Sequence, residues 1–149
     1  MVKVKVAILD DEQNDLNKVH NYFKSISSNS IQYNCDEYKQ LNEQFFNYDL
    51  YVLDIELPTI SGFEVAEKIK EKCPNAVLII HSKRNDLVFE SFKFGVFFFV
   101  RKDHFDIDMD FCQLRLKDHF VNNKKSIVIN QQLIPYQNIM FIEKINQNI

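Results

Sequence analysis

The sequence has few of the residues that characterise disordered, fibrous or disulfide-rich chains. Its 149 residues include only 2 glycines and 3 prolines, which argues against a disordered or fibrous chain. The three cysteines, Cys35, Cys73 and Cys112, are far apart and odd in number, so they form neither a metal-type pair nor a disulfide framework. We therefore expect small buried thiols in a reducing cytosol.

The chain also lacks an excess of positive charge and any long apolar run. Its net charge of -3 and pI of about 5.8 give no broad attraction to DNA or to anionic membranes. The N-terminus shows no signal-peptide pattern, and the longest nearly apolar stretch, residues 94–100, is too short to span a bilayer. We expect a soluble, cytoplasmic protein.

Apolar residues make up 46% of the chain and alternate between strand-like and helix-like patterns. Strands are predicted at residues 4–9, 31–35, 50–53, 76–80 and 96–100. Helices are predicted at residues 16–26, 38–46, 63–72, 87–94 and 107–121. Five β-α units in succession predict an α/β fold with a doubly wound, five-stranded parallel sheet, in which the polar second strand lies at an edge.

The alternation stops near Asn122, so we expect one α/β domain at residues 1–121 and a short β-rich extension at residues 122–149. The last helix of the first part should bury a stripe made of Ile107, Phe111, Leu114 and Val121. Beyond it, residues 126–130 are predicted as one strand and residues 133–143 as another, interrupted by Pro135.

Polar side chains follow four of the five predicted strands. They are Asp10-Asp11-Glu12 after the first, Asp54 after the third, Ser82 after the fourth and Lys102 after the fifth. The carboxyl ends of parallel strands lie along one edge of a sheet, which is where open α/β folds bind ligands. The sequence therefore predicts that these groups converge on one site.

The residue types at this site suit phosphoryl chemistry. Clustered carboxylates repel one another, and Mg²⁺ relieves this because it takes oxygen ligands. A carboxylate such as Asp54 can accept a phosphoryl group as an acyl phosphate. Lys102 can then neutralise the charge of the transferring group, and the Ser82 hydroxyl can bond one of its oxygens.

Each residue alone has a simpler explanation. The acidic triplet precedes a helix whose amides it can cap, and Ser82 can cap the following helix. Asp54 alone can be a turn residue, Lys102 a solvated lysine and Phe99 a core residue. Only their joint arrangement on matching strand ends favours a phosphoryl site.

These motifs resemble the response-regulator receiver family over roughly residues 1–121. The resemblance implies that Asp54, within Val52-Leu53-Asp54-Ile55-Glu56-Leu57-Pro58, is the phosphoacceptor. It also implies Mg²⁺ as cofactor, with Asp11 as direct ligand, Asp10 in support, and Asp54 and the backbone carbonyl of Glu56 completing the protein ligands. Ser82 and Phe99 match the family's switch residues, and Lys102 its lysine.

The chain departs from the family pattern beside two of these residues. Asp103 follows Lys102 where a proline is common, and Lys83 follows Ser82 where a small residue is common. The tail at residues 133–143 resembles the opening of a LytTR-type DNA-binding domain, although Asn138 and Phe141 differ from its common residues. Most of such a domain would lie beyond Ile149.

We expect a two-component response regulator that is phosphorylated by a histidine kinase and controls transcription. It would be no enzyme beyond catalysing its own phosphorylation and hydrolysis. The resemblance also implies a homodimer through the face of the fourth helix, fifth strand and fifth helix. Phe98 is expected to add apolar surface there, or else to join Phe97 and Phe99 in the core.

Two other functions are weighed against this one. A phosphorylation-independent binding module is disfavoured by the complete set of Asp11, Asp54, Ser82 and Lys102, although Lys83 and Asp103 leave it open. A flavodoxin-like or other α/β enzyme lacks support because no glycine-rich phosphate loop follows the first strand.

Overall fold

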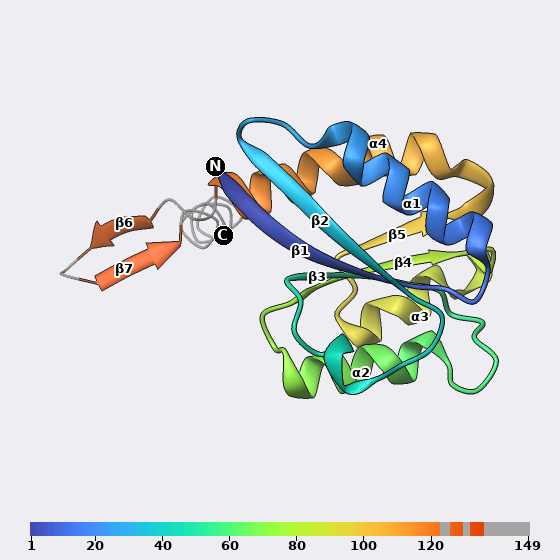
Figure 1. Ribbon diagram of the computed structural model, residues 1–149. Coiled ribbons are helices and arrows are strands. Elements are labelled where there is room, and N and C mark those ends of the chain that lie inside the picture. Colours follow the sequence, from blue (N-terminus) through green and yellow to red (C-terminus); the bar gives the residue numbers. More distant parts are fainter. Residues whose placement is uncertain (123–125, 130–131, 136–149) are drawn as a thin grey trace.

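The computed structural model describes residues 1–122 together with the backbone of residues 126–129 and 132–135. Five parallel strands form one sheet in the order β2-β1-β3-β4-β5 (Figure 1). Their bounds are β1 Val2–Leu9, β2 Ile31–Tyr38, β3 Leu50–Leu53, β4 Val77–Ser82 and β5 Phe98–Arg101. The α-helices are α1 Gln13–Ile26, α2 Gly62–Lys72, α3 Val88–Ser91 and α4 Phe105–Lys117. The predicted fold class is confirmed, and the polar β2 is an edge strand as expected.

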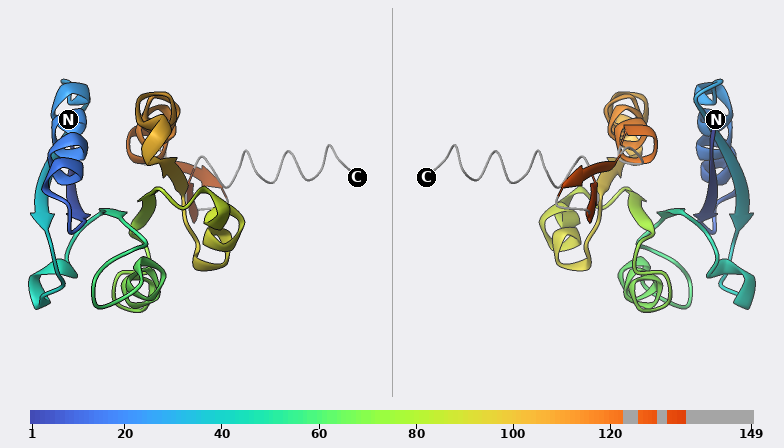
Figure 2. Two further views of the ribbon diagram at one scale, coloured as in Figure 1. Left: turned by 90° about the vertical axis from the view of Figure 1, so that its right-hand side faces the viewer. Right: turned by 90° about the vertical axis from the view of Figure 1, so that its left-hand side faces the viewer.

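Helices cover both faces of the sheet. α1 and α4 lie on one face, and α2 and α3 lie on the other (Figures 1 and 2). Side chains alternate across a strand, so Val6 and Ile8 join the cluster under α1 and α4, whereas Ala7 and Leu9 join the cluster over α2. Because both faces are packed, the central strands β3 and β4 are buried along their whole length, which explains their continuous apolar sequences.

The prediction of a helix at residues 38–46 is wrong. Strand β2 continues to Tyr38, which pairs with Leu9 of β1, and only a 3₁₀ turn at Glu43–Phe45 follows. The Asn42 side chain caps this turn by accepting a hydrogen bond from the amide of Gln44. The second crossover therefore has no α-helix, and the fourth and fifth helices of the sequence prediction correspond to α3 and α4.

The helix α4 buries a different face from the one predicted. Its buried residues are Phe105, Asp108, Met109, Cys112 and Leu116. The predicted stripe is exposed instead: Ile107, Phe111 and Leu114 are 60%, 64% and 61% accessible to solvent. Only Val121, in the turn after α4, packs against the core as expected.

The extension contains a short antiparallel pair. Strand β6, Ser126–Ile129, pairs with β7, Gln132–Pro135. The first agrees with the strand predicted at residues 126–130, whereas most of the strand predicted at 133–143 lies outside the described residues. No helix in the described part of the chain is long and apolar enough to cross a membrane.

Candidate functional site

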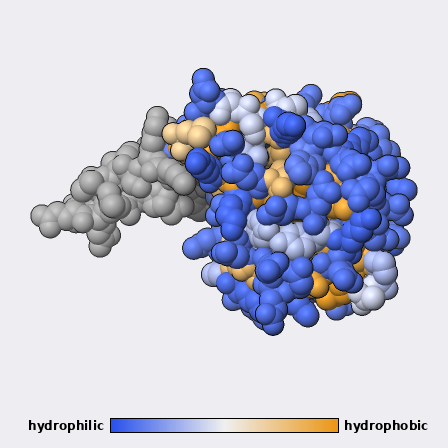
Figure 3. Space-filling model, viewed as in Figure 1, coloured by the Kyte–Doolittle hydropathy of each residue, from blue (hydrophilic) through white to orange (hydrophobic). Residues whose placement is uncertain are grey.

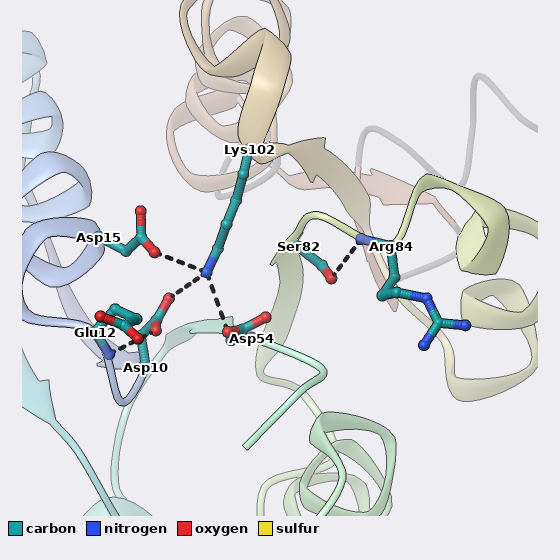
Figure 4. A network of polar contacts seen from close by, with 7 residues as sticks. All are labelled: Asp10, Glu12, Asp15, Asp54, Ser82, Arg84 and Lys102. Carbon is teal, nitrogen blue, oxygen red and sulfur yellow. Dashed lines mark hydrogen bonds and ion pairs between the residues drawn. The ribbon is translucent and has the colours of Figure 1, made fainter. Parts of the chain in front are cut away.

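The structure brings the predicted site residues together at the carboxyl edge of the sheet (Figure 4). Asp10 follows β1 and Asp54 follows β3, and these two strands are neighbours, with Leu9 paired to Leu53. Ser82 ends β4, and Lys102 follows β5. A cavity of about 180 Å³ opens between them and is lined by Asp11, Glu12, Asp15, Asp54, Glu56, Ser82, Lys83 and Lys102.

Lys102 lies at the centre of an ion-pair network. Its Nζ atom donates to Asp10 Oδ2 at 3.0 Å, Asp15 Oδ2 at 2.9 Å and Asp54 Oδ2 at 3.1 Å (Figure 4). An ammonium group has three N–H donors, so these contacts use all of them. The Lys102 side chain is only 8% exposed, so little water competes for these bonds.

Three carboxylates around one buried ammonium leave an excess of negative charge. Burial raises the pKa of Asp10 to about 6, although Lys102 and the amide of Glu12 oppose this. Burial also raises the pKa of Asp54 against the effect of Lys102. Burial opposes ionisation of Asp15 too, but its contact with Lys102 prevails and lowers its pKa. The surrounding carboxylates raise the pKa of Lys102 despite its own burial, so it stays charged.

A second, overlapping set of three carboxylates could hold a metal ion. Asp10, Asp11 and Asp54 each offer an oxygen, and these oxygens lie within 4.8 Å of one another. Oxygen ligands at this spacing suit a hard divalent cation, which would offset the excess charge. The Glu56 side chain points to another partner, because its Oε1 lies 3.5 Å from the Arg84 guanidinium. Its backbone carbonyl remains the expected ligand.

The two predicted switch residues occupy neighbouring strands. Ser82 is buried, and its Oγ accepts a hydrogen bond of 3.0 Å from the amide of Arg84 (Figure 4). Phe99 lies on β5 beside Ile80 and packs partly buried on the cluster over α2. Lys83 is exposed at the rim of the cavity. The peptide bond between Lys102 and Asp103 is trans.

Gly62 determines how closely α2 approaches Asp54. A β-carbon at Gly62 would lie 2.1 Å from the carbonyl oxygen of Asp54 and 2.8 Å from Cα of Ile55, which no real side chain can do. The Gly62 amide donates to the Ile55 carbonyl at 2.8 Å, and this bond ties the loop after Asp54 to the start of α2. A residue without a side chain is therefore needed here for the acidic edge to keep its shape.

Two polar residues near this edge were not among the predicted site residues: the partly exposed Asp15 and the buried His81. Asp15 lies in the first turn of α1, shortly after the acidic segment that precedes this helix. His81 precedes Ser82 in an otherwise apolar strand, and its side chain packs against the Phe105 ring with centroids 5.2 Å apart. Its Nε2 is buried without a hydrogen-bond partner among the residues that the structure describes.

Comparisons with known proteins agree with this geometry. The chain is 32% identical to the response regulator ArlR of Staphylococcus epidermidis over 83 residues, which cover 52% of this chain and 36% of ArlR. It is 27% identical to the transcriptional regulatory protein NatR of Bacillus subtilis over 104 residues, or 68% of this chain and 45% of NatR. The matches thus span well under two thirds of these relatives.

Solved structures with this fold include a receiver activated by BeF3 and a response regulator in complex with Mg²⁺-BeF. The receiver domain of DrrB activated by BeF3 is 26% identical, with a TM-score of 0.59 over 78% of this chain and 96% of that receiver domain. The response regulator TrrA of Thermotoga maritima, in complex with Mg²⁺-BeF, is 25% identical, with a TM-score of 0.61 over 76% of this chain and 97% of TrrA. The family model described as the response regulator receiver domain matches residues 6–109. The chain belongs to the response regulator receiver domain family.

Proposed function

We propose that this chain is the phosphoacceptor of a two-component system, in which a histidine kinase transfers a phosphoryl group to Asp54. The observation that carries the proposal is the buried contact between Lys102 and Asp54, together with the position of Asp54 beside two further carboxylates, Asp10 and Asp11, that can share one ion with it. The BeF3-activated receiver of DrrB and the complex of TrrA with Mg²⁺-BeF support it, because BeF3⁻ is a phosphomimetic.

The proposed step makes one bond and breaks one. An Asp54 carboxylate oxygen forms a bond to phosphorus while the bond from phosphorus to the donor's imidazole nitrogen breaks, and that nitrogen keeps the electron pair. Mg²⁺ held by Asp10, Asp11 and Asp54 would supply positive charge for the phosphoryl oxygens. Lys102 adds a fixed cation that is already desolvated, so it needs little reorganisation during the reaction.

Phosphorylation is proposed to act through Ser82 and Phe99. The Ser82 hydroxyl accepts a bond from Arg84 and keeps its own proton available as a donor to a phosphoryl oxygen. A move of Ser82 towards Asp54 would vacate space next to β5, where Phe99 is only partly buried. Filling of that space by the Phe99 ring would change the surface made by α3, β5 and α4.

The test is phosphorylation by a small donor. The chain is incubated with acetyl phosphate and Mg²⁺, and intact mass is compared for wild type, Asp54→Asn and the exposed control Asp36→Asn. One added phosphoryl group in wild type and in the control, but none in Asp54→Asn, is the expected result. No adduct on a folded wild-type chain would refute the proposal and favour a binding module that works without phosphorylation.

We also propose that the chain forms a homodimer through the α3, β5 and α4 face. Of the two alternatives for Phe98, its contacts favour packing on the core over a place in the dimer surface. Phe98 packs on the core beneath the Arg115 guanidinium, which lies 5.9 Å from the ring centroid. Exposed apolar side chains occur on both helices of this face: Phe89 and Phe92 lie in and directly after α3, and Ile107, Phe111 and Leu114 form a group on α4 that we call the α4 stripe. The side of the molecule in Figure 3, by contrast, is mainly hydrophilic with small separate apolar patches.

A second copy fits the α4 stripe because the helix is self-complementary in charge. Acidic residues occupy its first turn and Arg115 and Lys117 its last, so two antiparallel copies would place opposite charges together. Sedimentation at increasing concentration should show a dimer for wild type and for Phe111→Leu, but a monomer for Phe111→Asp. A Phe111→Asp chain that associates as strongly as wild type would exclude this surface.

The output is proposed to be transcriptional and the location cytoplasmic. NatR, a transcriptional regulatory protein, is among the relatives, and residues 133–143 resemble the opening of a LytTR-type domain. We accordingly propose residues 1–121 as the receiver and residues 122–149 as a linker and the beginning of a DNA-binding output domain. Limited proteolysis should then leave a stable fragment that ends close to residue 121, and a resistant full-length chain would contradict this boundary.

A further inference from the structure

Lys102 contacts one more carboxylate than the proposed reaction needs. Asp10 and Asp54 belong to the group of carboxylates that can share an ion, but Asp15 does not. Asp15 nevertheless makes the shortest of the three bonds to Nζ, at 2.9 Å. Its side chain is 23% exposed, compared with 2% for Asp10 and 8% for Asp54, so it is also the partner most easily released to water.

The position of Asp15 opposes the movement that phosphorylation requires of Lys102. In Figure 4, Asp15 reaches Nζ from the first turn of α1, whereas Ser82 lies on the other side of the amine, beyond Asp54. A phosphoryl group on Asp54 that bonds to Ser82 therefore extends away from α1. All three donors of Nζ are in use, so a phosphoryl oxygen can bond to the ammonium only if a carboxylate gives up its place.

We propose that Asp15 is a positioning residue that restrains phosphorylation, because it holds the Lys102 ammonium on the α1 side of the cavity in the unphosphorylated protein. This inference rests on the proposed function of Asp54. Asp15 also lines the cavity that the donor must enter, so its negative charge opposes an anionic donor. Competition for Lys102 and charge repulsion act in the same direction, and removal of the carboxylate should favour the phosphorylated form.

The experiment compares phosphorylation rates by phosphoramidate at saturating Mg²⁺ among folded variants. Asp15→Asn should react roughly fivefold faster than wild type, as expected for the loss of one partly exposed competing hydrogen bond to a charged group. Asp15→Glu, which restores the carboxylate, should return towards the wild-type rate. Asp106→Asn removes an exposed acid from the first turn of α4 and should react like wild type. Affinity for BeF3⁻ with Mg²⁺ should rise in Asp15→Asn by a similar factor.

The same comparison in a Lys102→Met variant separates positioning of the ammonium from repulsion of the anionic donor. When Lys102 is replaced by Met, the additional change Asp15→Asn should accelerate phosphorylation clearly less than it does in the wild-type background, because only the relief of charge repulsion remains. An equal acceleration in both backgrounds would overturn the positioning role, and so would an Asp15→Asn chain no faster than wild type. If Asp15→Asn does not fold, Asp15→Ala is measured in its place. A wild-type chain that accepts no phosphoryl group at Asp54 would instead refute the proposed function and, with it, this inference.

Discussion

The buried histidine next to the switch serine should make folding stability depend on pH. His81 is 2% exposed and faces the ring of Phe105 and the charges of Lys102, Asp15 and Lys18. Burial, aided by the positive charge of Lys102, lowers its pKa from 6.5 to about 3. The folded protein therefore keeps a neutral imidazole at pH values where the unfolded chain has already bound a proton.

The sign and size of the effect follow from this difference in proton binding. A lowered pKa in the folded state costs nothing above pH 6.5, and stability is lost progressively as the pH falls from 6.5 towards about 3. Each pH unit in that window corresponds to about 1.36 kcal/mol, so a fall from about pH 7.5 to about pH 5 should cost about 2 kcal/mol from His81 alone. Asp10, whose raised pKa has the opposite effect, is common to all the variants compared.

The contribution of His81 to the free energy of unfolding is measured by urea unfolding at the two pH values. The experiment compares wild type with His81→Leu and His81→Gln. Both variants lack the titrating group, so both should lose about 2 kcal/mol less than wild type on acidification, whatever their stability at neutral pH. Leu removes the unpartnered buried nitrogen, whereas Gln keeps a polar group in its place. If both variants lose the same stability on acidification, the difference from wild type is due to titration of the imidazole. An equal loss in wild type and both variants would refute the reasoning.

Two further substitutions and the addition of Mg²⁺ test the contacts that hold the site in place. Gly62→Ala should lower the free energy of unfolding by about 1–3 kcal/mol and slow phosphorylation, because its methyl group would collide with the Asp54 carbonyl; thermal unfolding and intact mass measure the two effects. Asp108→Asn should cost about 1–3 kcal/mol in urea unfolding, because the buried Asp108 carboxylate accepts bonds from the Arg101 amide, Nε and Nη2. Mg²⁺ at ten times its dissociation constant should stabilise the protein by about 1.4 kcal/mol, and Asp11→Asn should remove most of this shift.

The acidic edge was predictable because it depends on strands that the sequence marks clearly. The apolar run Leu50–Leu53 is buried on both sides, so the first polar residue after it has to lie at the carboxyl edge, and that residue is Asp54. The same reasoning placed Asp10 and Ser82. It could not find the role of Asp15, whose partner Lys102 is 87 residues away and is reached only because α1 and β5 converge.

The second crossover shows how tertiary contacts override local preference. Residues 38–46 have a composition compatible with a helix, but pairing with β1 extends β2 as far as Tyr38. The Tyr38 hydroxyl then bonds to that of Tyr48, and the Phe45 ring is buried against Tyr38. Few residues are left between Tyr38 and Phe45. A helix that short forms too few hydrogen bonds to offset the conformational entropy lost in its first turn.

The error in α4 arises because two of its faces are apolar at helical spacing. Phe105, Met109, Cys112 and Leu116 recur three or four residues apart, and so does the α4 stripe, so periodicity alone cannot choose between them. The ion pair between Asp108 and Arg101 determines which face is buried. Asp108 accepts three hydrogen bonds from Arg101 at the end of β5, and these bonds turn the side of α4 that carries Asp108 inward.

The rotation of α4 and the proposed dimer are therefore linked, and two substitutions should separate them. Because the bonds between Asp108 and Arg101 hold the α4 stripe outward, Asp108→Asn should weaken both folding and dimerisation. Phe111→Asp changes only an exposed position, so it should abolish dimerisation and leave the free energy of unfolding of the monomer within about 0.5 kcal/mol of wild type. If Phe111→Asp destabilised the monomer as much as Asp108→Asn does, the stripe would have to be part of the core in solution, and the orientation of α4 described above would be wrong.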